Sequence, residues 1–463
     1  MASFTVSHIC CTSMPLLPLF KMLLFFPFFI TIISAAKLTT TNSSFSMSFP
    51  LTTHSLSTNA TAKMLSSSLM LSSRNTKAPS SSSSSSYNLR STFKYSNVLI
   101  VTLPIGTPPQ AQQMILDTGS QLSWIQCHNK KAVKPPPPPP TPSFDPSLSS
   151  TFSVLPCTHP LCKPQIPDFT LPTSCDQNRL CHYSYFYADG SYAEGNLVRE
   201  KLTFAPAHST PPLILGCATY SSDARGILGI NRGRLSFSSQ AKINKFSYCV
   251  PPRQVQPGPA PTGSFYLGNN PHSTGFKYIP MLTFSQSQRM PNLDPLAYTV
   301  AMNGIRIGGK RLNISPAVFR PDAGGSGQTM VDSGSEFTYL VSEAYDKVRE
   351  EVVRIVGPRM KKEYVYGGMA DMCFDGRDAG VEIGRLIGEM VFEFEKGVEI
   401  VVPKERVLAD VGGGVHCIGI GSSDKLGAAS NIIGNFHQQN LWVEFDLTNR
   451  RVGFGGADCS RLG

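Results

Sequence analysis

The stretch MILDTGSQLSWIQ (residues 114–126) recurs in altered form as TMVDSGSEFTYLV (residues 329–341). Aligning the two places Asp117 opposite Asp332, with Gly119 and Gly334 each two positions later. In both copies an apolar run leads into the Asp, and a Ser and an apolar, aromatic-containing exit follow the Gly. This repeat predicts two related halves that each deliver one Asp on a tight turn.

The composition of the chain favours two domains built mainly from strands. A length of 463 residues exceeds the usual size of one hydrophobic core. The 38 Gly and 37 Pro residues punctuate short β-branched and aromatic runs such as LILGC and NLWVEFDL. Residues 342–357 are the exception, because a Ser start, acidic residues and a final Gly predict a surface helix. We therefore expect an all-β fold with few short surface helices.

The first 36 residues have the features of a removable secretory signal peptide. Lys21 precedes the apolar run MLLFFPFFITII, and SAA provides small residues for cleavage before Lys37. A plastid transit peptide is the competing interpretation, because the first 90 residues hold six Lys or Arg and no Asp or Glu. Residues 37–93 are low in complexity and rich in Ser and Thr, so we expect a segment that cannot bury a core and is either disordered or a removable prosegment.

The charge distribution gives no support for nucleic-acid binding. The chain carries a formal net charge of +10, and the six cations of the first 90 residues leave +4 beyond them. No basic stripe with interleaved aromatic residues appears. KPPPPPPTP (134–142) predicts a stiff exposed loop, with docking to a proline-reading partner as the alternative. After signal removal we expect no stable membrane span.

Ten cysteines follow the predicted signal peptide. An even number in a secreted chain indicates a disulfide framework. Zinc is the alternative for the central group, but its C-x4-C and C-x5-C spacings lack the tight C-x2-C of zinc sites. We therefore expect disulfides, and neither a metal nor a cofactor. The ten are Cys127, Cys157, Cys162, Cys175, Cys181, Cys217, Cys249, Cys373, Cys417 and Cys459.

The repeated motif has a chemical interpretation. Gly at the second position after each Asp allows backbone amides to approach the carboxylate, and neighbouring hydroxyls add donors. Two such loops meeting across a pseudo-twofold axis would place Asp117 and Asp332 side by side, where both cannot easily ionise. One carboxylate could then activate a water while the other, protonated, donates to a carbonyl oxygen. The supporting loop residues are Thr118, Gly119, Ser120, Ser333, Gly334 and Ser335.

Asp-Thr-Gly and Asp-Ser-Gly are also ordinary turn tripeptides. A single copy would favour that structural interpretation. Two copies with matching apolar approaches and aromatic exits favour the catalytic one.

Over residues 95–463 the chain resembles pepsin-like aspartic proteases, and within them the plant nepenthesin-type enzymes. VTLPIGTPPQ (101–110) is similar to the hairpin before the first Asp, and GILGI (226–230) and NIIGN (431–435) are similar to the segments beneath the catalytic loops. The resemblance implies a bilobal fold, with an N-terminal lobe at 94–255 that carries a Cys-rich insertion and a C-terminal lobe at 256–463.

The resemblance also assigns a flap. YFYADGSYAEGNL (185–197) is similar to the flap hairpin, which implies that Tyr187 and Gly190 cover the substrate and that Trp124 hydrogen-bonds Tyr187. For Tyr187 the alternative is a plain strand aromatic, and for Trp124 a plain core residue.

Two departures from the nepenthesin pattern stand out. The family usually has two further cysteines after the first catalytic strand, where this chain has CHNKKAVKPPPPPP. The second motif continues with Glu336 where the family usually has Thr or Ser. A carboxylate there could raise the pKa of the Asp pair or change subsite preference, or it could point away.

The resemblance implies disulfides Cys373–Cys417 and Cys249–Cys459. Within the insertion, nesting suggests Cys157–Cys181 and Cys162–Cys175, which leaves Cys127 for Cys217.

The resemblance implies an aspartic endopeptidase that acts as a monomer on polypeptide substrates in the secretory pathway. A catalytically inactive pepsin-fold binding or inhibitor protein of the plant cell wall is the alternative. In a chain that enters this pathway, Asn313 in the sequon NIS should carry a glycan.

Overall fold

The computed structural model describes residues 37–38, 46–55, 97–128, 142–163, 173–205, 208–222, 225–253, 261–284, 290–376 and 378–461. Compactness divides the chain into two units, Met1–Ala35 and Ala36–Gly463, and all described residues belong to the second. The predicted signal peptide and nearly all of the polyproline stretch therefore lie outside the described residues.

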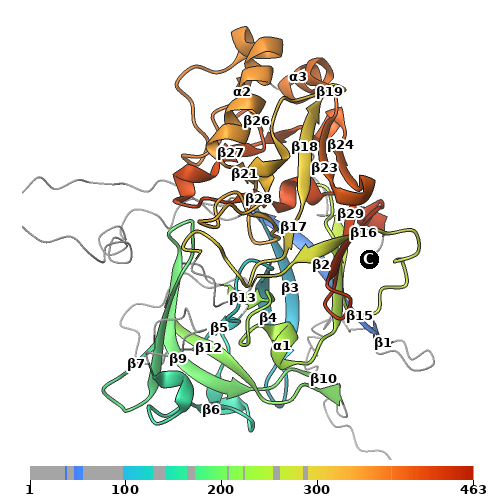
Figure 1. The fold of residues 1–463 in the computed structure, drawn as a ribbon. Coiled ribbons are helices and arrows are strands. Elements are labelled where there is room, and N and C mark those ends of the chain that lie inside the picture. The colour runs from blue at the N-terminus through green and yellow to red at the C-terminus, as the bar shows by residue number, and fades with distance from the viewer. Residues whose placement is uncertain are drawn as a thin grey trace, which may run out of the picture. The chain divides into compact units, whose positions relative to one another are not determined.

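Strands dominate the second unit, and they form two lobes joined by a shared sheet (Figure 1). The all-β, bilobal prediction is confirmed. The first lobe contains β3 (Asn97–Ile105), β4 (Gln110–Asp117), β5 (Trp124–Gln126), β6 (Ser153–Val154), β7 (Thr173–Cys175), β8 (Cys181–Phe186), β9 (Tyr192–Glu200), β10 (Thr203–Ala205), β11 (His208–Ser209), β12 (Leu213–Ser221), β13 (Gly226–Gly229) and the short helix α1 (Phe237–Gln240).

The second lobe is built from shorter strands and two longer helices. Its elements are β17 (Thr299–Val300), β18 (Met302–Ile307), β19 (Lys310–Arg311), β20 (Thr329–Val331), β21 (Thr338–Leu340), α2 (Ser342–Val356), β22 (Cys373–Asp375), α3 (Ala379–Ile387), β23 (Met390–Phe394), β24 (Glu399–Val402), β25 (Leu408–Asp410), β26 (Val415–Ile418), β27 (Ile420–Ser422) and β28 (Asn431–Ile433).

Each lobe delivers its Asp from the same strand arrangement. In the first lobe β13 runs parallel to β4, with Gly229 opposite Asp117, and Ile227 of β13 also pairs with Trp124 of β5. In the second lobe β28 runs parallel to β20, and Ile432 pairs with Tyr339 of β21. The segments predicted to thread beneath the loops therefore do so in both halves.

The shared sheet connects the lobes through antiparallel neighbours. β14 (Lys245–Cys249) pairs with β15 (Thr262–Gly268) on one side and β29 (Leu441–Asp446) on the other. β29 continues to β30 (Arg451–Gly456) and then to β16 (Lys277–Leu282). The chain thus crosses between lobes through a sheet in which both lobes have strands.

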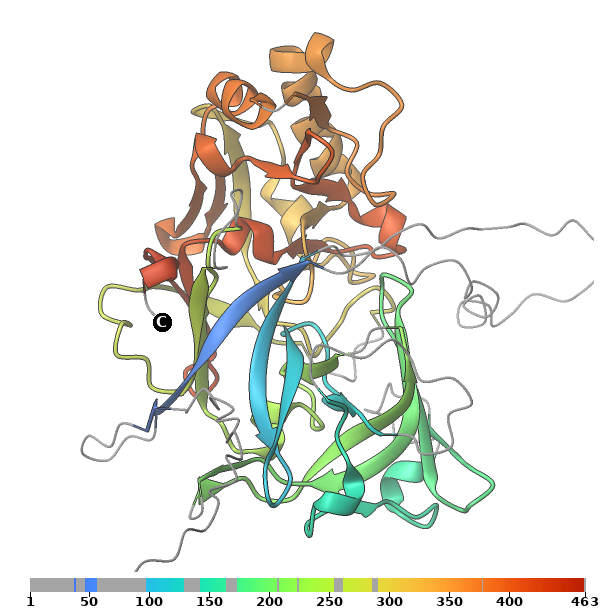
Figure 2. The same cartoon turned by 180° about the vertical axis from the view of Figure 1, so that it is seen from behind.

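One strand of this sheet comes from residues 37–93, the segment that was expected not to bury a hydrophobic core. β2 (Ser46–Ser55) lies between β15 and β3 (Figure 2), and the short β1 (Lys37–Leu38) pairs with it. Met47, Phe49 and Leu51 are at most 4% exposed. The expectation that residues 37–93 cannot bury a core is wrong for this stretch, because the period-2 alternation within SMSFPLTTHS fills one face of a strand.

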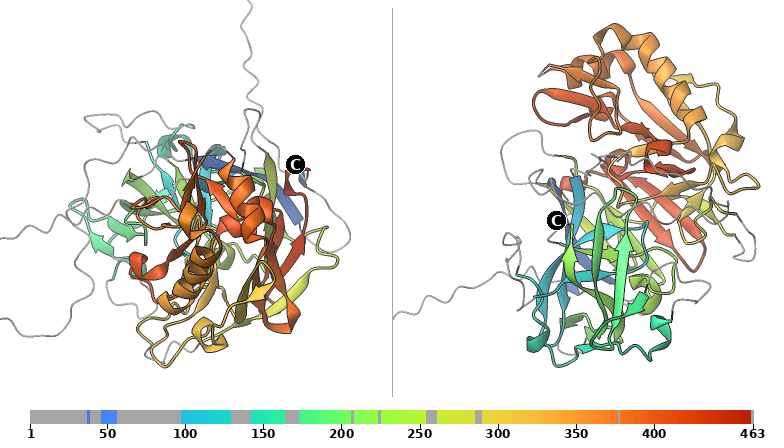
Figure 3. Two further views of the ribbon diagram at one scale, coloured as in Figure 1. Left: turned by 90° about the horizontal axis from the view of Figure 1, so that it is seen from above. Right: turned by 90° about the vertical axis from the view of Figure 1, so that its left-hand side faces the viewer.

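The predicted surface helix is confirmed as α2, which ends at Val356, one residue before the predicted limit. Its buried residues, among them Tyr345, Val348 and Val352, form one stripe at helical spacing. α2 and α3 lie at the end of the second lobe remote from β9 (Figures 1 and 3). Among the described residues no helix is long and apolar enough to cross a membrane.

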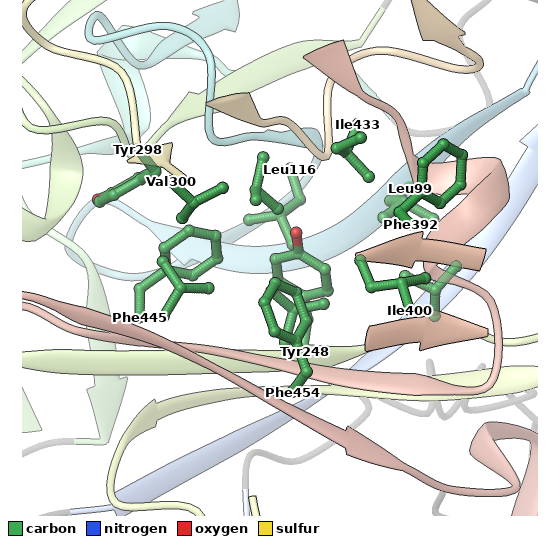
Figure 4. Close-up of a cluster of buried hydrophobic side chains, with 14 of the residues drawn as sticks. Leu99, Leu116, Tyr248, Tyr298, Val300, Phe392, Ile400, Ile433, Phe445 and Phe454 are labelled. Carbon is green, nitrogen blue, oxygen red and sulfur yellow. The ribbon is translucent and has the colours of Figure 1, made fainter. Parts of the chain in front are cut away.

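Side chains from both lobes meet in one buried cluster (Figure 4). Leu99 and Leu116 come from β3 and β4, Ile433 from the second lobe, and Tyr248 and Phe445 from the shared sheet. The apolar burial beneath the two Asp loops is therefore continuous across the lobes.

Five disulfides join the ten predicted cysteines, and three pairs are as predicted: Cys127–Cys217, Cys249–Cys459 and Cys373–Cys417. The nested arrangement of the insertion is wrong. The bonds cross in sequence, as Cys157–Cys175 and Cys162–Cys181.

The reason for the crossing is the hairpin of β7 and β8. Its register sets Cys175 directly opposite Cys181, so their side chains lie next to each other. Both can therefore form disulfides with the one segment that carries Cys157 and Cys162. That segment places the buried Cys162 next to the buried Cys181 and leaves Cys157 for the exposed Cys175.

Candidate active site

Two Asp side chains sit in matching hydrogen-bond cradles. The Gly119 amide donates to Oδ1 of Asp117 at 2.8 Å, and the Ser120 hydroxyl donates to Oδ2 at 2.5 Å. In the second loop the same donors, from residues 334 and 335, reach Oδ1 and Oδ2 of Asp332 at 2.9 and 2.6 Å. The repeated sequence therefore produces repeated geometry at the level of single hydrogen bonds.

A second set of bonds joins the two loops. The Thr118 amide donates to Oγ of Ser333 at 3.1 Å, and the Ser333 amide donates to Oγ1 of Thr118 at 2.9 Å. Each hydroxyl in turn donates to a carbonyl of the other lobe. The Thr118 hydroxyl donates to the Val331 carbonyl, and the Ser333 hydroxyl donates to the Leu116 carbonyl. All four groups are buried, so this reciprocal network fixes the separation of the two carboxyl groups.

The two carboxyl groups face each other across this network, and the structure brings the predicted pair together. A methyl group added at Gly119 would lie 2.9 Å from Oδ1 of Asp332, and one added at Gly334 would lie 2.3 Å from Oδ1 of Asp117. Only glycine at these two positions lets each loop approach the opposite carboxyl group.

The environment of Asp117 favours its protonated form. Asp117 is 7% exposed and Asp332 is 9% exposed. Burial, with the negative charge of Asp332 as the second cause, raises the pKa of Asp117 to about 7, and donors from Ser120 and Gly119 oppose the rise. The pair can hold one proton between its carboxyl groups across the acidic range.

The hairpin of β8 and β9 carries the predicted flap residues. Tyr187 lies in its turn, where its amide donates to the Ser191 carbonyl at 2.9 Å. Gly190 has φ of +77°, a conformation that favours glycine. Nε1 of the buried Trp124 donates to the Tyr187 hydroxyl at 2.7 Å, so the expected Trp–Tyr bond is present.

The Glu336 side chain lies against a cation, Arg253. Its Oε1 lies 3.0 Å from Nη1 of Arg253 and accepts from Nδ2 of Asn97 at 3.2 Å. The main causes of the raised pKa of Asp117 are its burial and the charge of Asp332, whereas Glu336 is paired with Arg253.

Several side chains around the loops were given no role by the sequence, although Asn435 ends the segment NIIGN that was singled out. The buried Tyr248 donates its hydroxyl to Oε1 of Gln438 at 2.6 Å, and Nε2 of Gln438 donates to the Asp332 carbonyl at 3.2 Å. Nδ2 of Asn435 donates to the Ser333 carbonyl at 3.1 Å. These side chains support the second loop from below, and their role depends on contacts between segments that are distant in sequence.

The described residues contain no group of three or more His, Cys, Asp or Glu side chains that could hold a metal ion.

The two facing carboxyl groups within paired Asp-Thr/Ser-Gly loops, on a bilobal strand-rich fold, define the class of pepsin-like aspartic proteases.

Comparison with known proteins agrees with this class. Residues 99–269 match the family described as "Xylanase inhibitor N-terminal", and residues 297–456 match "Xylanase inhibitor C-terminal". The chain is 37% identical over 395 residues to aspartic proteinase PCS1 of Arabidopsis thaliana, which covers 80% of this chain and 84% of that protein. It is 33% identical over 368 residues to aspartic proteinase nepenthesin-1 of Nepenthes gracilis, which covers 78% of each.

Two solved structures share the fold at low identity. Basic 7S globulin from soybean superposes with a TM-score of 0.54 at 15% identity, over 79% of this chain and 95% of that one. The structure of edgp superposes with a TM-score of 0.55 at 17% identity, over 79% of this chain and 94% of that one. The sequence relatives and the fold together show that this chain belongs to the plant aspartic proteinase family.

Proposed function

We propose that the protein is an aspartic-type endopeptidase in which Asp117 and Asp332 act together on a water molecule. The observation that carries the proposal is the pair of facing carboxyl groups, each held by an amide and a hydroxyl of its own loop. Turn tripeptides with a merely structural role would not require two glycines pressed against the opposite carboxyl group.

The proposed reaction is general acid–base hydrolysis. The raised pKa of Asp117 supports a reaction in which Asp117 starts as the protonated member of the pair, and we propose Asp332 as the base. Asp332 takes a proton from water as the water oxygen bonds to the scissile carbonyl carbon, and Asp117 donates its proton to the carbonyl oxygen. Asp332 then gives its proton to the amide nitrogen as the C–N bond breaks, and Asp117 takes a proton back from a hydroxyl of the tetrahedral intermediate, which becomes the carboxyl product. The pair thus returns to its single-proton state.

The flap residues are proposed to close over the substrate. Tyr187 is held at the end of the β8–β9 hairpin by the Trp124 bond, and Trp124 begins the strand that leaves the first catalytic loop. Closure over an extended polypeptide would exclude water and orient the scissile bond. Thr118 and Ser333 are proposed to fix the loop separation that this geometry requires.

A non-catalytic binding protein of the cell wall is the second candidate. The matching family descriptions name xylanase inhibitors, and one structural neighbour is basic 7S globulin from soybean. The complete double cradle favours catalysis, since a binding protein has no use for two buried carboxyl groups in mutual contact.

Digestion of a denatured protein at pH 3–7, with and without pepstatin, tests the proposal. The enzyme should cleave at acidic pH, pepstatin should block the cleavage, and activity should decline as the pH rises through about 7, where Asp117 ionises. A folded preparation with intact disulfides that cleaves nothing in this range would favour the binding protein.

We also propose that the protein is a glycosylated monomer of the secretory pathway. Five disulfides lie within the described residues, and Asn313 is exposed beside β19. Enzymatic deglycosylation should lower the mass of the mature protein, and Asn313→Gln should abolish that shift. An unchanged mass in the wild type would contradict glycosylation at Asn313.

A further inference from the structure

The second catalytic loop carries a buried charge that the first lacks. Glu336 directly follows Ser335, whose hydroxyl holds the Asp332 carboxyl group. Its side chain is 2% exposed and lies within 3.0 Å of Nη1 of Arg253. The aligned position of the first loop is the uncharged Gln121.

Arg253 is held on several sides. Its side chain is 13% exposed, and its guanidinium carbon lies 4.8 Å from the ring centroid of Phe436 and 5.5 Å from that of Phe337. A guanidinium over aromatic faces keeps its charge at low hydration. Its backbone amide donates to Oε1 of Gln439 at 3.2 Å. The cation is therefore placed by the fold to meet Glu336.

The ion pair joins three segments that meet only in the folded protein. Asn97 begins β3 of the first lobe, Arg253 follows the β14 crossing, and Glu336 belongs to the second catalytic loop. The main chain strengthens the same contact, because the Phe436 amide donates to the Glu336 carbonyl at 2.9 Å and the Asn435 amide to the Ser335 carbonyl at 2.8 Å.

We infer that Glu336, acting through Arg253, is a positioning residue that holds the second catalytic loop in register with the first. The inference rests on the proposed function. The ion pair fixes Glu336 next to the two donors of Asp332, on Gly334 and Ser335. Small displacements of such donors cost far more in turnover than in stability.

Other ionisable groups near the pair do not replace its charge. His437 is fully buried, and its Nδ1 lies 2.7 Å from Oγ1 of Thr338. Burial, followed by the charges of Arg253 and Arg406, lowers the pKa of His437 to about 3, so it stays neutral over most of the acidic range. His437 therefore supplies no positive charge to the contact between Glu336 and Arg253 over that range.

Glu336→Gln is the direct test, because it keeps the shape and the Asn97 bond but removes the charge. We expect kcat to fall ~10- to 100-fold with KM within ~3-fold of wild type. Arg253→Met should match it, and the double variant should be no worse than either single, since the two residues act as a unit. Pepstatin affinity, which is independent of turnover, should weaken ~10-fold in both single variants.

Glu351→Gln is the matched control. Glu351 is 5% exposed in the same lobe and bonds Lys310 and Arg354, each at 2.6 Å, on α2 and β19 rather than on a catalytic loop. Its loss should lower the melting temperature and leave kcat and pepstatin affinity unchanged. A Glu336→Gln variant that behaves like Glu351→Gln would overturn the positioning role.

Arg253→Lys supplies the test if neither Glu336→Gln nor Arg253→Met folds. It keeps the charge but loses the planar stacking, so a ~3- to 10-fold lower kcat at an unchanged melting temperature supports the inference. An unchanged kcat overturns it. A wild-type protein that neither cleaves nor binds pepstatin overturns the proposed function, and this inference with it.

Discussion

The loop of Asp117 and the loop of Asp332 share their inner hydrogen bonds and their strand framework, and they differ in the side chains that follow them in sequence. The amide and hydroxyl donors agree to within 0.1 Å between the two cradles. Outside them, the first loop exits through Trp124 to the flap, whereas the second carries Glu336 toward Arg253. Sharing a proton requires the same hydrogen bonds around both Asp residues. Closure over a substrate and anchoring between the lobes each require a contact from only one of the two loops.

The largest effect should come from the symmetric part. Asp117→Asn and Asp332→Asn should each lower kcat/KM at least ~10³-fold, because neither carboxyl group can act without its partner. Hydrolysis of a fluorogenic peptide at pH 4, with melting temperatures as the folding control, checks this. Substantial residual activity of Asp332→Asn would break the equivalence of the two loops.

The two motif glycines should sharpen the comparison. Gly119→Ala and Gly334→Ala should both reduce kcat/KM by ~10²-fold, since each new methyl group displaces the opposite carboxyl group. Gly334→Ala should be the more severe, because its methyl group would lie 2.3 Å from Asp117 Oδ1 against 2.9 Å from Asp332 Oδ1 for Gly119. Gly456→Ala, which would contact nothing within 4 Å, is the control. Equal activity of all three variants would contradict the close approach.

The flap tests the asymmetric part. Tyr187→Ala should lower kcat ~10-fold with little change in melting temperature, because a closing hairpin contributes to turnover more than to the core. Tyr187→Phe removes only the bond from Trp124 and should cost ~3- to 10-fold. Phe186→Ala, on the neighbouring residue that is 47% exposed, serves as the control. A lowered melting temperature with unchanged kcat would make Tyr187 a plain strand aromatic.

The smallest expected effect is on stability. The pKa of Asp117 is raised from 3.8 to about 7 in the folded state, so the protonated form stabilises the fold below pH 3.8 and this contribution is lost as the pH rises through 7. Asp117→Asn should therefore raise the free energy of unfolding by roughly 2 kcal/mol at pH 8, after the loss of one hydrogen bond, and lower it by roughly 2 kcal/mol at pH 3, where only that loss remains. Denaturant unfolding at the two pH values measures the difference. An equal change at both would remove the burial argument.

Sequence alone identified the parts that depend on short spacing. The two Asp-Thr/Ser-Gly loops and the helix at 342–357 are local patterns, whereas the segments GILGI and NIIGN were assigned through the family resemblance. A turn that presents a carboxylate to amides within three residues depends on those few residues, so its cradle could be predicted before any tertiary contact was known. The family resemblance added the flap, which no local pattern distinguishes from an ordinary hairpin.

Tertiary structure decided the features that depend on which segments meet. Nesting order could not predict Cys157–Cys175 and Cys162–Cys181, because the register of β7 and β8 places the two acceptors side by side. The Ser- and Thr-rich composition of residues 37–93 likewise gave no indication of β2. The alternating apolar residues of this strand are buried only because it pairs with β15 and β3. The orientation of Glu336 was open in the sequence because its partner lies 83 positions away, and burial allows a charge only where the fold supplies the opposite one.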